Sequence, residues 1–241
     1  MRNINISISH FPHLNKMIKT PWFKRVLPFA VYMLFILIFD LCKTVLPENV
    51  ADVWLTPIIY PVKIAAVAIV LIIFRKSYEE LSVTALKLRH IFAAIAAGVI
   101  VFVLWIHMDW NFATMGTPDS YDPEVLPLAW FYAFIFIRIF GASVIVPIFE
   151  EIFWRSFIIR YIINPDFLLV KIGTFTWVSF LFSSLLFGLE HHFWLAGIAS
   201  GIIYNLLLYR TRDIWYCIVA HGITNFLLGI YVIKTGNWHF W

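Results

Sequence analysis

Charge is the scarcest property of this 241-residue chain. Only 13% of the residues are charged, whereas 62% are hydrophobic. A soluble domain of this length needs far more polar surface, so the composition predicts an integral membrane protein. The net charge of +4 would suit a nucleic-acid partner, but basic loops that orient a membrane protein account for it. We therefore expect membrane lipids as neighbours and no nucleic acid.

Cysteine is also rare, which excludes a disulfide framework. Cys42 and Cys217 lie in apolar runs far apart and form no C-x-x-C pair. A cleavable signal peptide is not apparent either. The first apolar run begins only near Val26, behind the basic leader of residues 1–25, and we expect it to remain as the first span.

Long apolar runs are what the chain has instead. Most are close to the ~20 residues that a helix needs to cross the hydrocarbon core, and one is nearly twice as long. The sequence therefore predicts an all-α, polytopic membrane helix bundle, with N-terminal membrane helices in 26–126 and a second part in 127–241. The runs fall at about 26–42, 57–74, 91–107, 127–163, 173–190, 194–209 and 215–234.

The distribution of Lys and Arg predicts the orientation. The segments 1–25, 75–90 and 210–214 carry five, four and two basic residues, whereas 108–126 carries none. Because basic loops stay in the cytoplasm, this pattern predicts seven crossings of the plasma (inner) membrane with a cytoplasmic N-terminus. Pro147 predicts a break in the 127–163 run, which leaves an eighth membrane helix open.

Three charged residues interrupt the longest run, at Glu150, Glu151 and Arg155. A charge in the membrane is costly, so each needs a partner or a task. Glu151 and Arg155 are four residues apart on one helical face, which predicts an ion pair. Glu150 points about 100° away and is left without that partner, so it is the candidate working carboxylate, acting as a general base.

Two later apolar runs carry histidines at helical spacing. Phe187 and His191 share one face in F-G-L-E-H-H, and His221 and Asn225 share another in H-G-I-T-N. A lone histidine or asparagine of this kind is usually structural. Together with the glutamate pair they form a constellation on three helices that can hold and activate a water molecule.

The motifs E-E-x-x-x-R at 150–155, F-x-x-x-H at 187–191 and H-x-x-x-N at 221–225 resemble, in this order, those of the CAAX-protease and bacteriocin-processing (Abi) family of intramembrane proteases. That family includes the type II CAAX prenyl endopeptidases. The resemblance covers about residues 127–232 and implies that 127–241 is a catalytic membrane core. In size and layout the chain also resembles the CAAX-protease-related proteins that accompany exosortase systems.

The resemblance implies roles for single residues. Glu150 would activate the water, His191 would help to bind it, and His221 and Asn225 would position it and stabilise the oxyanion. Glu151, Arg155 and Phe187 would support them. The cofactor is left open: Glu150, His191 and His221 are a legitimate zinc set, but the chain lacks the H-E-x-x-H helix of zinc peptidases, which favours a metal-free form.

The predicted function is an intramembrane endopeptidase that acts on a membrane-associated peptide or protein. A non-catalytic scaffold or immunity factor is one alternative. A proton-coupled transporter is another, since intramembrane Glu and His also build proton relays, but we find no inverted repeat.

Three further expectations concern single segments. With regular vertical helices His191 and His221 would lie at different depths, so we expect an irregular, protein-lined connection at 189–194. Glu79 and Glu80 lie in a basic loop and are expected to form a solvated face. Arg138 either pairs with the substrate or extends its head group toward the interface.

Overall fold

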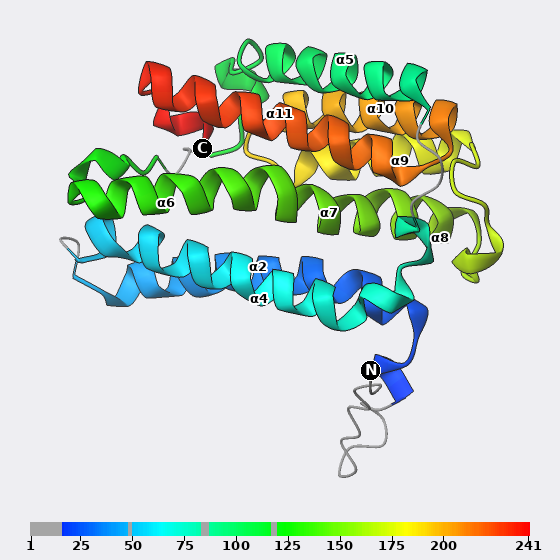
Figure 1. The fold of residues 1–241 in the computed structure, drawn as a ribbon, viewed down its shortest axis with the longest axis horizontal. Helices are drawn as coiled ribbons and strands as arrows, with labels where there is room; N and C mark the ends of the chain where they lie inside the picture. The colour runs from blue at the N-terminus through cyan, green and yellow to red at the C-terminus, as the bar shows by residue number, and fades with distance from the viewer. Residues whose placement is uncertain (1–15, 48–49, 83–86, 117–119) are drawn as a thin grey trace.

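The chain folds into a bundle of roughly parallel helices (Figure 1). This computed structural model describes residues 16–47, 50–82, 87–116 and 120–241, and no strand occurs among them. The first 15 residues of the basic leader, and residues 117–119 of the acidic loop, lie outside the described residues. The predicted fold class, a membrane helix bundle, is confirmed.

The helices form three layers (Figure 1). The pair α2 and α4 packs on one side of a long central helix, and the remaining helices pack on its other side. The bounds are α2 (Pro21–Val45), α4 (Thr56–Phe74), α5 (Leu88–Trp105), α6 (Leu128–Phe140), α7 (Val146–Glu151), α8 (Ile159–Ile163), α9 (Trp177–Leu189), α10 (Trp194–Thr211) and α11 (Ile214–Thr235).

Five helical segments of the described residues are long and apolar enough to cross a membrane. They are 21–45, 53–77, 88–105, 128–163 and 214–235. Helix α9 has only 13 residues, which gives it a length of about 20 Å at 1.5 Å per residue. Helices α9 and α10 form an antiparallel hairpin, so the chain enters and leaves this pair at the same end of the bundle. Whether the pair crosses the membrane therefore does not change the side on which any other loop lies. The count of seven crossings stays a prediction.

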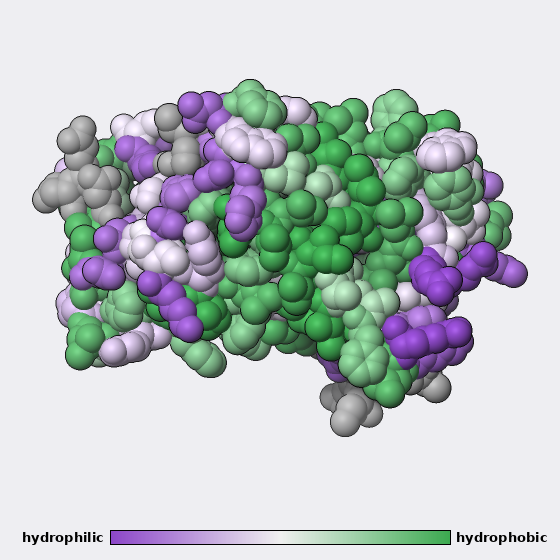
Figure 2. All heavy atoms as spheres, turned by 90° about the horizontal axis from the view of Figure 1, so that it is seen from above, coloured by the Kyte–Doolittle hydropathy of each residue, from purple (hydrophilic) through white to green (hydrophobic). Residues whose placement is uncertain are grey.

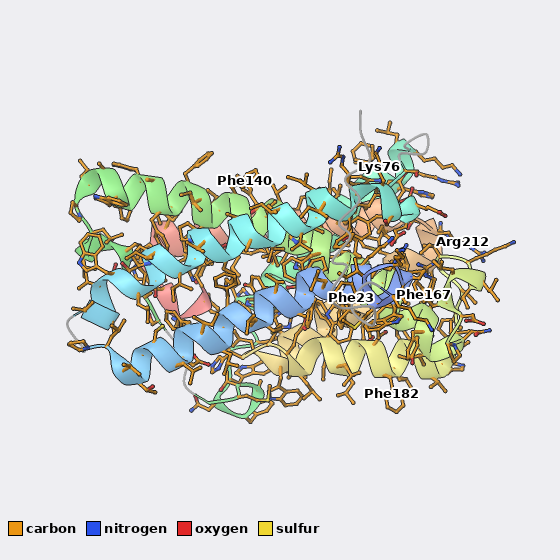
Figure 3. The ribbon with its side chains drawn as sticks, turned by 90° about the horizontal axis from the view of Figure 1, so that it is seen from below. Phe23, Lys76, Phe140, Phe167, Phe182 and Arg212 are labelled. Carbon is orange, nitrogen blue, oxygen red and sulfur yellow. The ribbon has the colours of Figure 1, made fainter. Side chains whose placement is uncertain are left out.

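The surface has the pattern that a bilayer requires. Figure 2 shows a hydrophobic band across the middle of the bundle, with hydrophilic residues gathered toward both ends. In Figure 3 Phe140 and Phe182 point outward from the sides of the bundle, whereas Lys76 and Arg212 lie at one common end. Both phenylalanines are about half exposed. The band is therefore the lipid-facing surface of the protein.

The predicted break at Pro147 is wrong. Residues 128–163 form one continuous helix, because π-helical turns at Gly141–Ile145 and Ile152–Ile158 interrupt its α-helical register without ending it. In the first π turn Val146 donates its N–H to the carbonyl of Gly141, five residues back. Pro147 has no N–H for the next carbonyl, that of Ala142. The side chain of Asn225 on α11 donates to that carbonyl instead, at 2.8 Å, so a neighbouring helix satisfies the group that proline leaves free.

Small residues hold α9 against α10. A Cβ atom added to Gly197 would lie 2.8 Å from the Cα atom of Gly188, and one added to Gly201 would lie 2.9 Å from the Cα atom of Ser184. Two small residues four positions apart on each helix let the backbones approach closely, as in small-xxx-small pairs in membranes. This contact fixes the end of α9, where His191 follows.

The expected solvated face at Glu79 and Glu80 is wrong for Glu80. Its carboxylate forms an ion pair with Arg25 of α2, at 2.6 Å, and accepts a hydrogen bond from Ser156 of the long helix, also at 2.6 Å. Burial raises the pKa of Glu80, but the hydrogen bond and charge of Arg25 outweigh it and hold the pKa below its ordinary value. Glu80 therefore ties the 79–81 turn to both α2 and the long helix, whereas Glu79 is exposed.

Candidate active site

A cavity of about 300 Å³ lies within the bundle, beside the long helix. Four of the residues singled out as catalytic from the sequence line it: Glu150, His191, His221 and Asn225. The other lining residues come from both halves of the chain, and they are Tyr32, Tyr60, Val101, Trp105, Arg138, Ala142, Val146, Phe187, Ser200, Tyr204, Thr224, Leu228, Phe240 and Trp241.

Glu150 is the carboxylate that faces this cavity. It is only 7% exposed, and its Oε2 atom has no hydrogen-bond partner. The nearest basic group is Nε2 of His221, 4.0 Å from that oxygen. A buried carboxylate oxygen without a partner is costly to maintain, so it marks a group kept available for a ligand or a reaction.

Glu151, the next residue, points about 100° away from Glu150, and each of its oxygens lies close to a basic side chain. One oxygen lies 3.1 Å from Nε of Arg155, and the other lies 3.0 Å from Nδ1 of His221. The ion pair predicted from the i, i+4 spacing is therefore present. The guanidinium group of Arg155 also lies 4.3 Å above the ring of Phe187, and neither charged group is reached by solvent. The pair consequently holds His221 in place.

His191 follows the end of α9, in the connection formed by residues 190–193. Its Nδ1 atom lies 2.7 Å from the carbonyl oxygen of Phe187. Because a carbonyl only accepts hydrogen bonds, Nδ1 carries the proton and Nε2 is left with a free lone pair. The predicted irregular, protein-lined connection is confirmed: Phe193 is buried, and the carbonyl of His192 accepts from the N–H of Met115.

The comparison with protein families agrees with this geometry. Residues 132–227 match the family described as type II CAAX prenyl endopeptidase Rce1-like. We refer to this matched segment as the Rce1-like domain. All seven residues that the sequence singles out for the site lie within it. Since type II CAAX prenyl endopeptidases are proteases, the match and the apolar helices together indicate an intramembrane protease. No curated protein and no solved structure matches the chain.

Glu190 of this Rce1-like domain is not among the site residues predicted from the sequence. One oxygen each of Glu150 and Glu190 and one ring nitrogen of His191 lie within 4.8 Å of one another. Indole Nε1 of Trp154 donates to Glu190 at 2.9 Å and so holds it there. The signal in the sequence is a carboxylate directly before His191, in an otherwise apolar segment.

These three side chains offer the donor atoms that a divalent metal ion takes. The zinc set expected from the sequence differs, because it includes His221 and not Glu190. In the group that the structure brings together Glu150 itself would be a ligand. With Glu151 occupied by Arg155 and His221, no other carboxylate on that helix would then be left to act as the base.

The helices before the Rce1-like domain supply part of the cavity wall, which the motifs do not reveal. Tyr32 of α2, Tyr60 of α4 and Trp105 of α5 all line it. The ring of Trp105 meets the imidazole of His191 edge to face, with the ring centroids 5.3 Å apart. Tyr204 of α10 stacks on His221 at 5.3 Å. Their signal in the sequence is weak, because aromatic residues are frequent everywhere in this chain.

The Glu151–Arg155 pair predicts a stability effect. Replacing Arg155 by Ala leaves Glu151 buried without its cation, which typically costs ~3–5 kcal/mol. We expect a clear fall in the thermal unfolding temperature of the protein in detergent. Arg210→Ala, which removes an exposed arginine at the end of α10, is the matched control and should change little. Equal unfolding temperatures for the two variants would contradict the structural role of the pair.

Proposed function

We propose that the protein is an intramembrane endopeptidase in which Glu150 activates the hydrolytic water. One observation supports this most. Of the two glutamates, Glu150 lines the cavity, its Oε2 atom has no hydrogen-bond partner, and it lies beside two histidines whose Nδ1 atoms are held by other groups. In this proposal the substrate is a membrane-associated peptide or protein, and residues 127–241 form the catalytic core with the helices of 26–126 as its outer wall.

The chemistry follows from the hydrogen bonds of each side chain. A water between Glu150 and Nε2 of His191 gives its proton to Glu150 as its oxygen attacks the peptide carbonyl. Glu150 then passes that proton to the leaving amine when the C–N bond breaks. A general base in this position must come within about 2.6–3.2 Å of the water.

The oxyanion needs donors on the other side of the cavity. His221 faces the Glu151 carboxylate through Nδ1 and the Glu150 carboxylate through Nε2, so in its imidazolium form it would donate to the oxyanion from Nε2. Asn225 uses one amide hydrogen for the Ala142 carbonyl and has a second one left for the cavity. The oxyanion contacts proposed for these two residues therefore require no rearrangement of their supporting bonds.

Replacing Glu150 by Gln tests the catalytic base. The amide keeps the size of the side chain and removes the proton acceptor, so cleavage should fall by at least ~100-fold, the lower bound for general-base catalysis. The measurement compares peptide termini in membranes that contain the wild-type protein, Glu150→Gln or the exposed-site control Glu79→Gln. Termini that appear equally with all three proteins would exclude Glu150 as the base, provided that unfolding temperatures show all three to be folded.

Metal removal separates the two forms of the mechanism. Since the available donor group would consume Glu150 as a ligand, we expect peptide cleavage to survive dialysis against EDTA and 1,10-phenanthroline. Metal analysis of the purified protein accompanies the assay. Loss of cleavage on chelation, with recovery on adding zinc, would instead assign the ion to Glu150, Glu190 and His191.

We further propose that the protein lies in the plasma membrane with its basic end, and so its N-terminus, in the cytoplasm. Lys76 and Arg212 share that end (Figure 3), and Glu124 belongs to the loop that leads into α6, which begins at the other end of the bundle (Figure 1). In intact cells a membrane-impermeant maleimide should label Glu124→Cys, and it should label Arg212→Cys only after permeabilisation. Labelling of both positions from one side would refute this orientation.

A further inference from the structure

The cavity continues beyond the glutamates toward Arg138 of α6. Arg138 precedes Glu150 by twelve residues on one continuous helix, which separates them by about 18 Å along its axis. Tyr60 and Trp241 line the cavity at the same place, and each presents its ring to the Arg138 guanidinium group, at 5.4 Å and 4.8 Å from the ring centroid. One cavity therefore connects the reactive carboxylate to an arginine.

Arg138 has no anionic partner within the part of the chain that the structure describes. Its guanidinium group lies over three aromatic rings, the third being that of Phe134 at 5.7 Å. The other two arginines of the long helix, which are buried, differ, since Arg155 pairs with Glu151 and Arg160 donates to Ser156. An arginine at membrane depth without a partner is costly. An arginine that only reached for the interface would lie in water, not on a cavity wall.

A second cavity, of about 200 Å³, adds another cation on the far side of Arg138. It shares Tyr32, Tyr60 and Arg138 with the first cavity. Lys63 lines it, with its Nζ atom 4.0 Å from the ring centroid of Tyr32. Asp40 lines the same cavity, so the three charges leave this region with one net positive charge. The Glu150 side and the Arg138 side of these two neighbouring cavities thus differ in net charge.

We propose that Arg138 binds a carboxylate of the substrate and thereby sets which peptide bond reaches Glu150. This inference rests on the proposed function, since it requires a peptide in the cavity. Guanidinium binds carboxylate through two parallel hydrogen bonds, and flanking aromatic rings keep its plane fixed. An extended peptide rises about 3.3 Å per residue, so the ~18 Å along the helix axis spans at most about five residues.

The carboxylate has two possible sources, the C-terminus of the substrate or an acidic side chain. Three synthetic hydrophobic hexapeptides distinguish them: one with a free C-terminal carboxylate, its C-terminal amide, and the same amide with glutamate as the last residue. Binding is measured by isothermal titration calorimetry on the Glu150→Gln protein in detergent, which keeps the peptides intact.

We expect the free acid to bind at least ~10-fold more tightly than the amide, because a hydrogen bond between charged groups typically strengthens binding by that factor or more. This preference for the free acid should disappear in Arg138→Gln. It should persist in part in Arg138→Lys, which keeps the positive charge but cannot form the two parallel hydrogen bonds of a guanidinium group. Lys234→Gln, at an exposed lysine near the end of α11, should leave the preference unchanged. If the glutamate-containing amide regains tight binding, a side-chain carboxylate suffices; if it does not, the C-terminus is the source.

Equal binding of acid and amide to the protein with Arg138 intact would overturn the inference while leaving the hydrolase test with Glu150→Gln unaffected. If none of the three peptides binds, the peptide cavity itself is rejected together with the role of Arg138. A preference for phosphatidylglycerol over phosphatidylcholine in native mass spectrometry, lost in Arg138→Gln and without any peptide preference, would assign Arg138 to a lipid phosphate and also overturn the proposal.

Discussion

The buried contact between Glu151, Arg155 and His221 is the constraint on which the site depends. Neither Glu151 nor Arg155 is solvated, so each charge depends on the other for its compensation. His221 of α11 contacts the same Glu151 carboxylate. That contact fixes the rotation of the long helix against α11. Since consecutive residues of a helix point about 100° apart, fixing Glu151 against α11 leaves Glu150 facing the cavity. The paired glutamate thus orients the unpaired one.

Fixing the rotation of the long helix does not fix its position along its own axis. A contact between α11 and the π turn before Pro147 fixes that position. The Ala142 carbonyl in this turn lacks the backbone N–H donor that any residue other than proline would supply at position 147. Asn225 of α11, one helical turn beyond His221, donates a side-chain hydrogen bond to that carbonyl instead. A shift of one helix along the other would separate both contacts at once. The side chain that the motif suggests for oxyanion stabilisation therefore also has a structural function.

Local spacing was enough to predict what lies within one helix, but not what lies between helices. The Glu151–Arg155 pair followed from four residues of separation, and the membrane bundle followed from the length of the apolar runs. The predicted break at Pro147 is wrong because the hydrogen bond that proline cannot make is supplied by Asn225, which lies 78 residues further along the chain. Glu80 was misjudged for the same reason, since its partners Arg25 and Ser156 come from distant helices. The proximity of Glu190 to Glu150 could not be predicted from spacing, because it depends on the conformation of the 190–193 turn.

On the proposed function, the residues of the reaction and those of substrate recognition lie in different parts of the chain. The charged side chains nearest Glu150 all come from residues 132–227, the Rce1-like domain, and they are Glu151, Arg155, Glu190, His191 and His221. Tyr32, Tyr60 and Lys63 precede this domain. Arg138 is the point where the two meet, because it lies on the long helix but stacks against Tyr60 of α4. On the proposed function, a change at Tyr60 or Lys63 of α4 would reshape the space offered to the substrate near Arg138, away from the Glu151–Arg155–His221 contact. Recognition could then vary while the hydrolytic geometry stays fixed.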